Sequence, residues 1–194
     1  MKLTIPSGPF EAYLFDLDGT IANSLPLHFK AWNQALAPYN SSMPEDLFYA
    51  WGGIPVPKTV EMLNEHFQIQ LPIDDVTRAR EHAYLNMMDD VTAHAAVDEI
   101  IRANYRRIPM AVVSGSARSS IIKTLTRLNL LEYFTALVGA EDYAKGKPDP
   151  EPFLTGARVL NVDPKKCLAF EDAEPGIQSA LSAGMKVVRI PQRF

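Results

Sequence analysis

Five short apolar runs alternate with amphipathic stretches along this chain of 194 residues, and this alternation constrains the possible fold most strongly. Each run is short and rich in β-branched or aromatic residues, as expected of buried strands. The runs are residues 12–15, 110–114, 136–140, 167–171 and 186–190, and helix-like stretches at 116–130, 149–161 and 174–184 lie between the later ones. Strands without a polar face that alternate with helices are typical of parallel sheets, so the sequence predicts an α/β fold.

The interval between the first two predicted strands is too long for one crossover. It holds roughly ninety residues, whereas a crossover needs only a dozen or more. Residues 24–91 read mainly as helices, and the segment 51–58 within them contains two glycines and two prolines, which indicates a shaped turn. We therefore expect an inserted helical domain at 23–91 and a core domain formed by 1–22 and 92–194.

Composition excludes several classes of function. The formal net charge of −4 argues against a general nucleic-acid or anionic-membrane surface. No stretch approaches the roughly 18 apolar residues of a membrane span, and the N-terminal residues lack a signal-peptide pattern. The only cysteine, Cys167, allows no internal disulfide. We expect a cytoplasmic protein that is a monomer and binds neither nucleic acid nor membrane.

Charged and hydroxyl side chains follow the predicted strands at the points where they end. Ligands of parallel sheets bind beyond the carboxyl ends of the strands, so these groups are expected to meet at one rim. Four segments of the chain contribute to it: Asp16 and Asp18; Ser114 and Gly115; Lys147; and Glu171 with Asp172. This convergence indicates a catalytic site more strongly than any single motif does.

Phosphoryl transfer is the chemistry that fits these groups. Asp16 and Asp172 could bind Mg²⁺, a hard cation that prefers oxygen ligands. Lys147 could neutralise charge on the phosphoryl oxygens, which Ser114 and the Gly115 amide could also hold. An aspartate can attack phosphorus and form an aspartyl-phosphate, and a second acid two residues on can exchange a proton with the leaving oxygen.

The motifs that carry these groups resemble those of the haloacid dehalogenase superfamily. They are DLDGT at 16–20, VVSGS at 112–116, KGKPDP at 145–150 and FEDAEPG at 170–176, in the order found in that family. The resemblance implies a Rossmann-like core with a helical cap inserted after the first motif. It implies the following roles: Asp16 as nucleophile; Asp18 as acid and base; Thr20, Ser114 and Lys147 around the phosphoryl group; and Mg²⁺ on Asp16, the Asp18 carbonyl and Asp172. Glu171 is then expected near the metal, with direct ligation as the less favoured alternative.

Within that superfamily the N-terminal part of the chain looks like the beta-phosphoglucomutase branch and its sugar-phosphate phosphatase relatives. His28 and Trp32 match that branch, as does the glycine turn around Gly53. The resemblance implies substrate contacts from His28 and Gly53. Lys58 could meet substrate as well or be a solvated lysine.

Three functions remain open on the sequence alone. The first is a Mg²⁺-dependent phosphatase of small sugar phosphates, of the fructose-1-phosphate or 6-phosphogluconate type. The second is a sugar-phosphate mutase, and the third is a non-catalytic binding protein on the same fold. The mutases carry an arginine three residues after the cap glycine and a Lys-Asn pair after the serine motif, where this chain has Val56, Ala117 and Arg118. These departures favour the phosphatase and a small phosphorylated metabolite as its partner.

Overall fold

The computed structural model describes residues 3–191 and contains one five-stranded parallel sheet. The strand order is β3-β2-β1-β4-β5, so the first strand lies at the centre. The strands are β1 (Ala12–Phe15), β2 (Met110–Val113), β3 (Ala136–Val138), β4 (Cys167–Glu171) and β5 (Lys186–Arg189). The predicted α/β fold with a parallel sheet is confirmed, and every strand falls within one of the five apolar runs.

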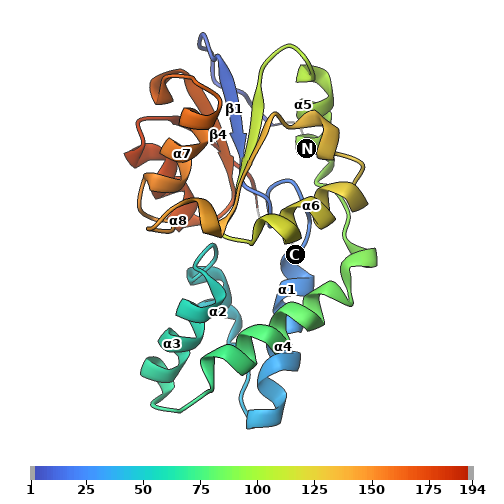
Figure 1. Cartoon of the computed structure of the whole chain (residues 1–194), viewed down its shortest axis with the longest axis vertical. Helices are drawn as coiled ribbons and strands as arrows, with labels where there is room; N and C mark the ends of the chain where they lie inside the picture. The colour runs from blue at the N-terminus through green and yellow to red at the C-terminus, as the bar shows by residue number, and fades with distance from the viewer. Residues whose placement is uncertain (1–2, 192–194) are drawn as a thin grey trace.

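Two helices cover each face of the sheet (Figure 1). On one face α5 (Ala95–Asn104) and α6 (Arg118–Arg127) pack on alternate strand residues, including Phe15 and Phe170, whose rings stack with centroids 4.3 Å apart. On the other face α7 (Glu151–Val159) and α8 (Glu174–Ser182) pack on Leu14 and Val113. Both faces of each central strand are therefore buried, which explains why the strands are continuously apolar.

Four helices form a separate layer beyond the carboxyl ends of the strands (Figure 1). They are α1 (Leu25–Leu36), α2 (Glu45–Ala50), α3 (Val56–Phe67) and α4 (Ile73–Leu85), here called the helical segment. They enclose an apolar cluster of their own, which includes Trp32, Leu36, Leu63 and Val76. Short 3₁₀ turns complete the chain: η1 (Ala37–Tyr39), η2 (Met88–Asp90), η3 (Leu131–Tyr133), η4 (Ala140–Asp142) and η5 (Pro164–Lys166).

The chain enters and leaves the helical segment at the same place. The backbone amide of Asn23 donates to the Thr92 carbonyl at 2.8 Å, and the amide of His94 donates to the Ile21 carbonyl at 2.8 Å. The two connecting stretches thus lie side by side next to the end of β1. Along residues 3–191, none of the helices has the length and apolar character needed to cross a bilayer.

Candidate active site

Asp16 follows β1 directly and is nearly covered by protein, with 6% of its surface exposed. The Lys147 ammonium donates to Asp16 Oδ1 at 2.6 Å and to Glu171 Oε1 at 2.7 Å. Burial raises the pKa of Asp16 well above its ordinary value; Lys147 opposes this rise, while Glu171 and Asp172 add to it. A further positive charge at this position would therefore favour the ionised form of Asp16.

Three buried carboxylates meet at the carboxyl ends of β1 and β4. Asp16, Glu171 and Asp172 each offer an oxygen, and these atoms lie within 4.8 Å of one another. An all-oxygen donor set suits a hard divalent cation such as Mg²⁺, so the residues fit the metal that the sequence implies. The Thr20 hydroxyl donates to Asp172 Oδ1 at 2.8 Å and orients that carboxylate.

Gly19 allows the Asp172 carboxylate to lie close to the backbone that follows β1. Its φ is +92°, and a Cβ on it would lie 2.3 Å from Asp172 Oδ2. A side chain at this position would therefore be strained in its backbone and would displace the Asp172 carboxylate. This explains physically why glycine follows the second aspartate of the DLDGT motif.

Glu171 is held at both carboxylate oxygens. Oε1 accepts from Lys147, and Oε2 accepts from the backbone amide of Ala173 at 2.7 Å. The space for this carboxylate exists because residue 176 is glycine: a Cβ there would lie 1.6 Å from Glu171 Oε1. Both oxygens of Glu171 are thus held by protein donors, and the expected role of Glu171 beside the metal stays a prediction.

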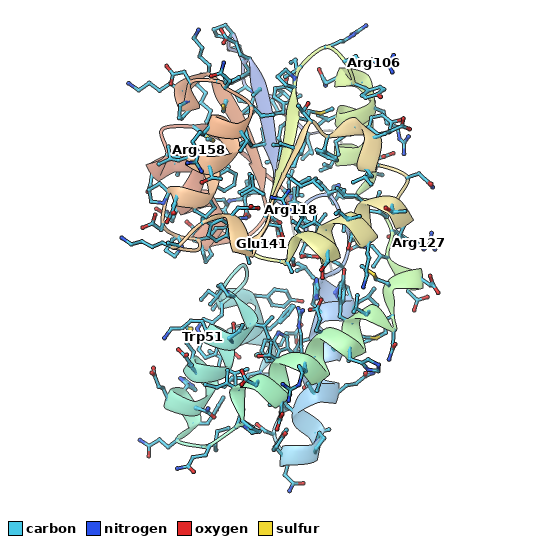
Figure 2. The ribbon with its side chains drawn as sticks, viewed as in Figure 1. Trp51, Arg106, Arg118, Arg127, Glu141 and Arg158 are labelled. Atoms are coloured by element: carbon cyan, nitrogen blue, oxygen red, sulfur yellow. The ribbon has the colours of Figure 1, made fainter. Side chains whose placement is uncertain are left out.

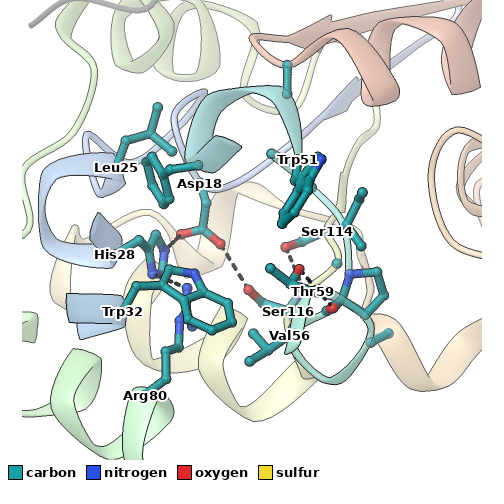
Figure 3. A pocket seen from close by; sticks show the side chains of 18 of the residues that line it. Asp18, Leu25, His28, Trp32, Trp51, Val56, Thr59, Arg80, Ser114 and Ser116 are labelled. Carbon is teal, nitrogen blue, oxygen red and sulfur yellow. Dashed lines mark hydrogen bonds and ion pairs between the residues drawn. The ribbon is translucent and has the colours of Figure 1, made fainter. Parts of the chain in front are cut away.

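Asp18 points toward the helical segment (Figure 3). It accepts three hydrogen bonds from side chains, those of Ser24, His28 and Ser116. Oδ1 accepts from the Ser24 hydroxyl at 2.8 Å and contacts His28 Nε2 at 2.8 Å, while Oδ2 accepts from the Ser116 hydroxyl at 2.9 Å. Burial opposes ionisation of Asp18, but His28 and the hydroxyl donors outweigh it and hold the pKa well below the ordinary value. The structure thus presents Asp18 as a carboxylate.

His28 lies between Asp18 and Arg80. Arg80 Nη2 contacts His28 Nδ1 at 2.7 Å. Because a guanidinium can only donate, Nδ1 must accept, and the ring proton of a neutral His28 then lies on Nε2, facing Asp18. Burial lowers the pKa of His28, Asp18 opposes this and Arg80 reinforces it. His28 is therefore a neutral donor that orients the Asp18 carboxylate.

Ser114 and Gly115 follow β2 and face the helical segment across a narrow gap. The Ser114 hydroxyl accepts from the Ser116 amide at 3.0 Å and lines the cavity described next. A Cβ on Gly115 would lie 3.0 Å from the carbonyl oxygen of Gly53, which has a φ of +82°. The glycine turn of the helical segment thus lies directly against the loop that follows β2.

One cavity of about 590 Å³ joins these groups. Its floor contains Asp16, Asp18, Ser114 and Asp172, and its opposite wall comes from the helical segment, including His28 and Gly53 (Figure 3). The volume lies in the range of about 300–1,000 Å³ that is usual for small-molecule sites. Most of the sequence-predicted residues therefore converge on one site, while Lys147, Thr20 and Lys58 do not line the cavity itself.

Lys147 is buried and contacts Asp16 and Glu171, which do line the cavity. Thr20 is fully buried and its hydroxyl donates to Asp172, and its place beside the phosphoryl group, which the resemblance implies, stays a prediction. Lys58 lies on α3, more than half exposed, and donates to Glu61 at 2.8 Å. It does not line the cavity, which agrees with the reading of a solvated lysine.

Sequence reasoning missed Arg80, Ser24 and Ser116 as parts of the site. Arg80 is distant from every strand end in the sequence, and it reaches His28 only because α4 packs against α1. Ser116 could have been found, because it follows Ser114 and Gly115 at the end of a strand. Ser24 lies just before α1, where a serine ordinarily indicates only a helix cap.

The site combines an acidic cluster, a buried lysine and a strand-end hydroxyl at the carboxyl ends of a parallel sheet, as expected of a hydrolase that acts on phosphate esters. A profile of the haloacid dehalogenase-like hydrolases matches residues 13–190. The chain belongs to this family.

Similar proteins and solved structures agree with this assignment. The fructose-1-phosphate phosphatase YqaB of Escherichia coli K12 is 33% identical over 181 residues, which cover 93% of this chain and 96% of that protein. The beta-phosphoglucomutase of Bacillus subtilis is 30% identical, over 94% of this chain and 84% of that protein. A crystal structure of beta-phosphoglucomutase from Clostridium difficile has the same fold, with a TM-score of 0.83 at 24% identity, and the match covers 92% of this chain and 83% of that one. The prediction of a phosphatase of this family is confirmed.

Proposed function

We propose that this enzyme hydrolyses monophosphate esters of small sugars with Mg²⁺ and an aspartyl-phosphate on Asp16. The observation that carries the proposal is the placement of Asp16 and the acidic cluster at the floor of one cavity, with Asp18 beside them and the buried Lys147 bound to Asp16. The names of the relatives support sugar phosphates as the substrate class. Among the types expected from the sequence, these names favour fructose 1-phosphate.

In the proposed first step an Asp16 carboxylate oxygen attacks phosphorus and the bond to the sugar oxygen breaks. The leaving oxygen takes a proton from Asp18, and in the second step Asp18 takes a proton from the water that attacks the aspartyl-phosphate. Asp16 is then regenerated and inorganic phosphate leaves. The first step requires the protonated form of Asp18, and the second requires the carboxylate, which the hydrogen bonds from Ser24, His28 and Ser116 favour.

Mg²⁺ would be held by Asp16, Asp172 and the carbonyl of Asp18, and when bound it would neutralise charge on the phosphoryl oxygens. Lys147 and the hydroxyl of Ser114 would hold the same oxygens from the protein side. Thr20 would act through Asp172, whose carboxylate it orients. Glu171 would act through Lys147, which it helps to hold.

The helical segment would act as a cap domain at 23–91 over a core formed by 1–22 and 92–194. The separate apolar cluster of the helical segment supports this division. The pairing of residues 21–23 with 92–94, where the chain enters and leaves the helical segment, supports it as well. A cap exposes the site to substrate when open and excludes water when closed. We expect the enzyme to act as a cytoplasmic monomer without nucleic-acid or membrane partners.

Hydrolysis is favoured over mutase activity because few cations face the cavity from the helical segment. Among the described residues of that segment, the cationic side chains that line the cavity are Arg78 and Arg80. Arg80 contacts His28 and is buried, while Arg78 is largely exposed and pairs with Asp75. A mutase intermediate carries two phosphates, and the second would meet Arg80 already engaged by His28 and Glu81.

The test incubates the protein with Mg²⁺ and a panel of sugar phosphates, and measures both free phosphate and isomerised sugar phosphate. Asp16→Asn, which removes the attacking carboxylate, and a sample with EDTA run in parallel. We expect phosphate release that Asp16→Asn and EDTA both abolish. Isomer without free phosphate would establish the mutase instead, and phosphate release that survives in Asp16→Asn would disprove Asp16 as the nucleophile.

A further inference from the structure

The wall that the helical segment contributes to the cavity is largely apolar and aromatic. Leu25, Trp32, Phe48 and Trp51 all line it. The floor, in contrast, carries the carboxylates and hydroxyls of the core. A substrate bound here has its phosphate on the polar floor, so the remaining part of the molecule lies against the aromatic wall.

Both tryptophans of the chain belong to this wall. Trp32 on α1 is nearly buried, and the Arg80 guanidinium lies 5.8 Å from the centre of its ring. Trp51 follows α2, is half-buried, and has one ring edge supported by His66, with ring centroids 6.0 Å apart. Figure 3 shows its indole pointing into the cavity, and Figure 2 places Trp51 at the end of the helical segment that faces the core.

The turn after Trp51 fixes this indole next to the phosphate-binding floor. Gly53 lies against Gly115 of the loop after β2, as described above. A Cβ on Gly52 would lie 3.4 Å from the Cβ of Ala173, which follows β4. The turn therefore lies between the two core loops, and Trp51 is placed beside the first atoms of any alcohol esterified to the phosphate.

The α4 side of the cavity offers hydrogen-bonding groups to a substrate. Thr77 Oγ1 and Arg80 Nε are buried and have no hydrogen-bond partner among the described residues. Both residues line the cavity, as does Glu81. An aromatic platform together with unsatisfied polar groups suits an alcohol with an apolar face and several hydroxyls.

The charges around the cavity disfavour a second negative group on the substrate. Arg80 is the buried cation of the wall, and it is enclosed by Trp32 and Tyr84 with its Nη2 on His28. Glu81 adds a carboxylate to the same wall. A carboxylate on the substrate would meet these groups in a partly desolvated space, where an unpaired charge is costly.

We propose that Trp51 is a stacking platform that selects singly phosphorylated sugars in their ring form, without a second charge. The inference rests on the proposed phosphatase function and specifies its substrate class. The apolar C–H face of a sugar ring packs on the indole, while the ring hydroxyls reach Thr77 and Arg80. An open-chain polyol has no such flat face, and a sugar acid adds a carboxylate that would face Glu81, while Arg80 is already engaged by His28 and Glu81.

The test compares substrates that differ only in these properties. Fructose 1-phosphate is paired with its reduced form, mannitol 1-phosphate, and glucose 6-phosphate is paired with sorbitol 6-phosphate and 6-phosphogluconate. We expect kcat/KM to be about tenfold higher for the better ring sugar than for its reduced partner, since aromatic contacts contribute about 0.5–1.5 kcal/mol beyond area burial. A preference for the open-chain partner in both sets, or for 6-phosphogluconate over glucose 6-phosphate, would overturn the proposal.

Variants of Trp51 separate stacking from a general effect on the fold. Trp51→Ala should reduce the ring-to-polyol ratio of kcat/KM about tenfold, mainly through KM, while Trp51→Phe keeps most of that ratio. Tyr39→Ala is the matched control, because Tyr39 is an exposed aromatic residue of the same region that does not line the cavity. An equal loss for ring and polyol substrates in Trp51→Ala would show that Trp51 is only structural.

Fluorescence makes the test independent of turnover. Because both tryptophans line the cavity, titration of Asp16→Asn with fructose 1-phosphate should change the emission, and Trp51→Phe in that background should remove most of the change. Mannitol 1-phosphate should require an about tenfold higher concentration. If no substrate releases phosphate, the phosphatase proposal fails, while ring-selective binding in this titration would still support the platform and equal binding would refute it.

Discussion

Arg80 Nη2 lies 2.7 Å from His28 Nδ1, and this contact determines which ring nitrogen of His28 carries the proton. The guanidinium can only donate, so Nδ1 accepts and Nε2–H faces Asp18, 2.8 Å away. A residue of α4 thus controls, through a histidine of α1, the orientation of the carboxylate that follows β1. Part of the catalytic geometry depends on the packing of the helical segment.

Arg80→Met should raise the pKa of His28. The substitution removes a cation that lowers this pKa and also the donor that favours an unprotonated Nδ1, while Asp18 still favours the charged ring. Nitrogen-15 NMR should show a neutral His28 with its proton on Nε2 in the wild type, and protonation at higher pH in the variant. Arg78→Met is the control, because Arg78 is exposed and pairs with Asp75. A His28 pKa that is the same in wild type and Arg80→Met would refute the role of this contact.

Lys147→Met should destabilise the protein and abolish turnover. Lys147 is buried between Asp16 and Glu171, so the substitution leaves two buried carboxylates without their cation. Breaking a buried ion pair in this way costs about 3–5 kcal/mol, and the loss of a charge that stabilises the phosphoryl group should lower kcat at least about a hundredfold. Chemical denaturation and a phosphate-release assay measure the two effects.

The control for this prediction lies two residues away. Lys145 is about three-quarters exposed, and its ammonium is 4.0 Å from Asp149. Exposed pairs of this kind contribute between zero and about 1 kcal/mol, so Lys145→Met should change stability and kcat little. Equal losses of stability and kcat in Lys147→Met and Lys145→Met would refute the view that the buried position of Lys147 causes the effect.

The strands and the floor of the site could be predicted because local sequence determines both. A buried parallel strand needs a continuous apolar run, and parallel strands place the residues that follow them at one rim. Asp16, Ser114 and Asp172 were therefore correctly expected to lie together. Helix α2 lies within the stretch predicted as helical, but its bounds could not be predicted, because six residues are too few for a helical period to be recognised.

The helical side of the site could not be predicted, because it depends on packing between elements. Nothing in the residues around Arg80 indicates that it reaches His28, fifty-two positions earlier. Lys58 shows the opposite case: it follows the glycine turn in sequence, yet helix α3 begins at Val56 and directs it to solvent beside Glu61. The position of a side chain around its helix decides whether it faces the cavity or solvent. Predicting that position requires the boundaries of the helix to be known to within one residue.

Cys167 should resist thiol reagents in the folded protein. Burial raises the pKa of its thiol to about 11, and the residue is fully covered at the start of β4. The thiolate is the reactive form, and an unfolded cysteine has a pKa of about 8.5. Because the folded pKa is the higher one, this group favours folding below about pH 8.5, and its contribution is lost as the pH rises through the folded value.

Labelling with a chromogenic disulfide measures this directly. At pH 8 the reaction should follow global unfolding, and denaturant should accelerate it strongly. Rapid labelling of the native protein at pH 8 would show that Cys167 is accessible and contradict its burial at the start of β4.

Gly176→Ala should disable the site without touching substrate. The new methyl group would lie 1.6 Å from Glu171 Oε1 and 2.7 Å from Oε2. Glu171 cannot simply turn away, because Lys147 and the Ala173 amide hold its two oxygens. The carboxylate must shift, Lys147 loses a partner, and the acidic cluster that is proposed to hold Mg²⁺ is distorted. We expect weaker Mg²⁺ binding by calorimetry and a stability loss of about 1–3 kcal/mol, as for other overpacked positions.

Gly146→Ala provides the matched comparison, because it is the same substitution in another motif of the rim. A Cβ there would come no closer than 3.6 Å, to Pro55, which is an ordinary contact. Where the backbone accepts alanine, this change alters stability by less than about 1 kcal/mol. If Gly176→Ala bound Mg²⁺ as tightly as Gly146→Ala does, the position of Glu171 would not matter to the metal. If both variants lost binding, the loops at this rim would be too rigid for any added methyl group, and the specific role of Gly176 would be refuted.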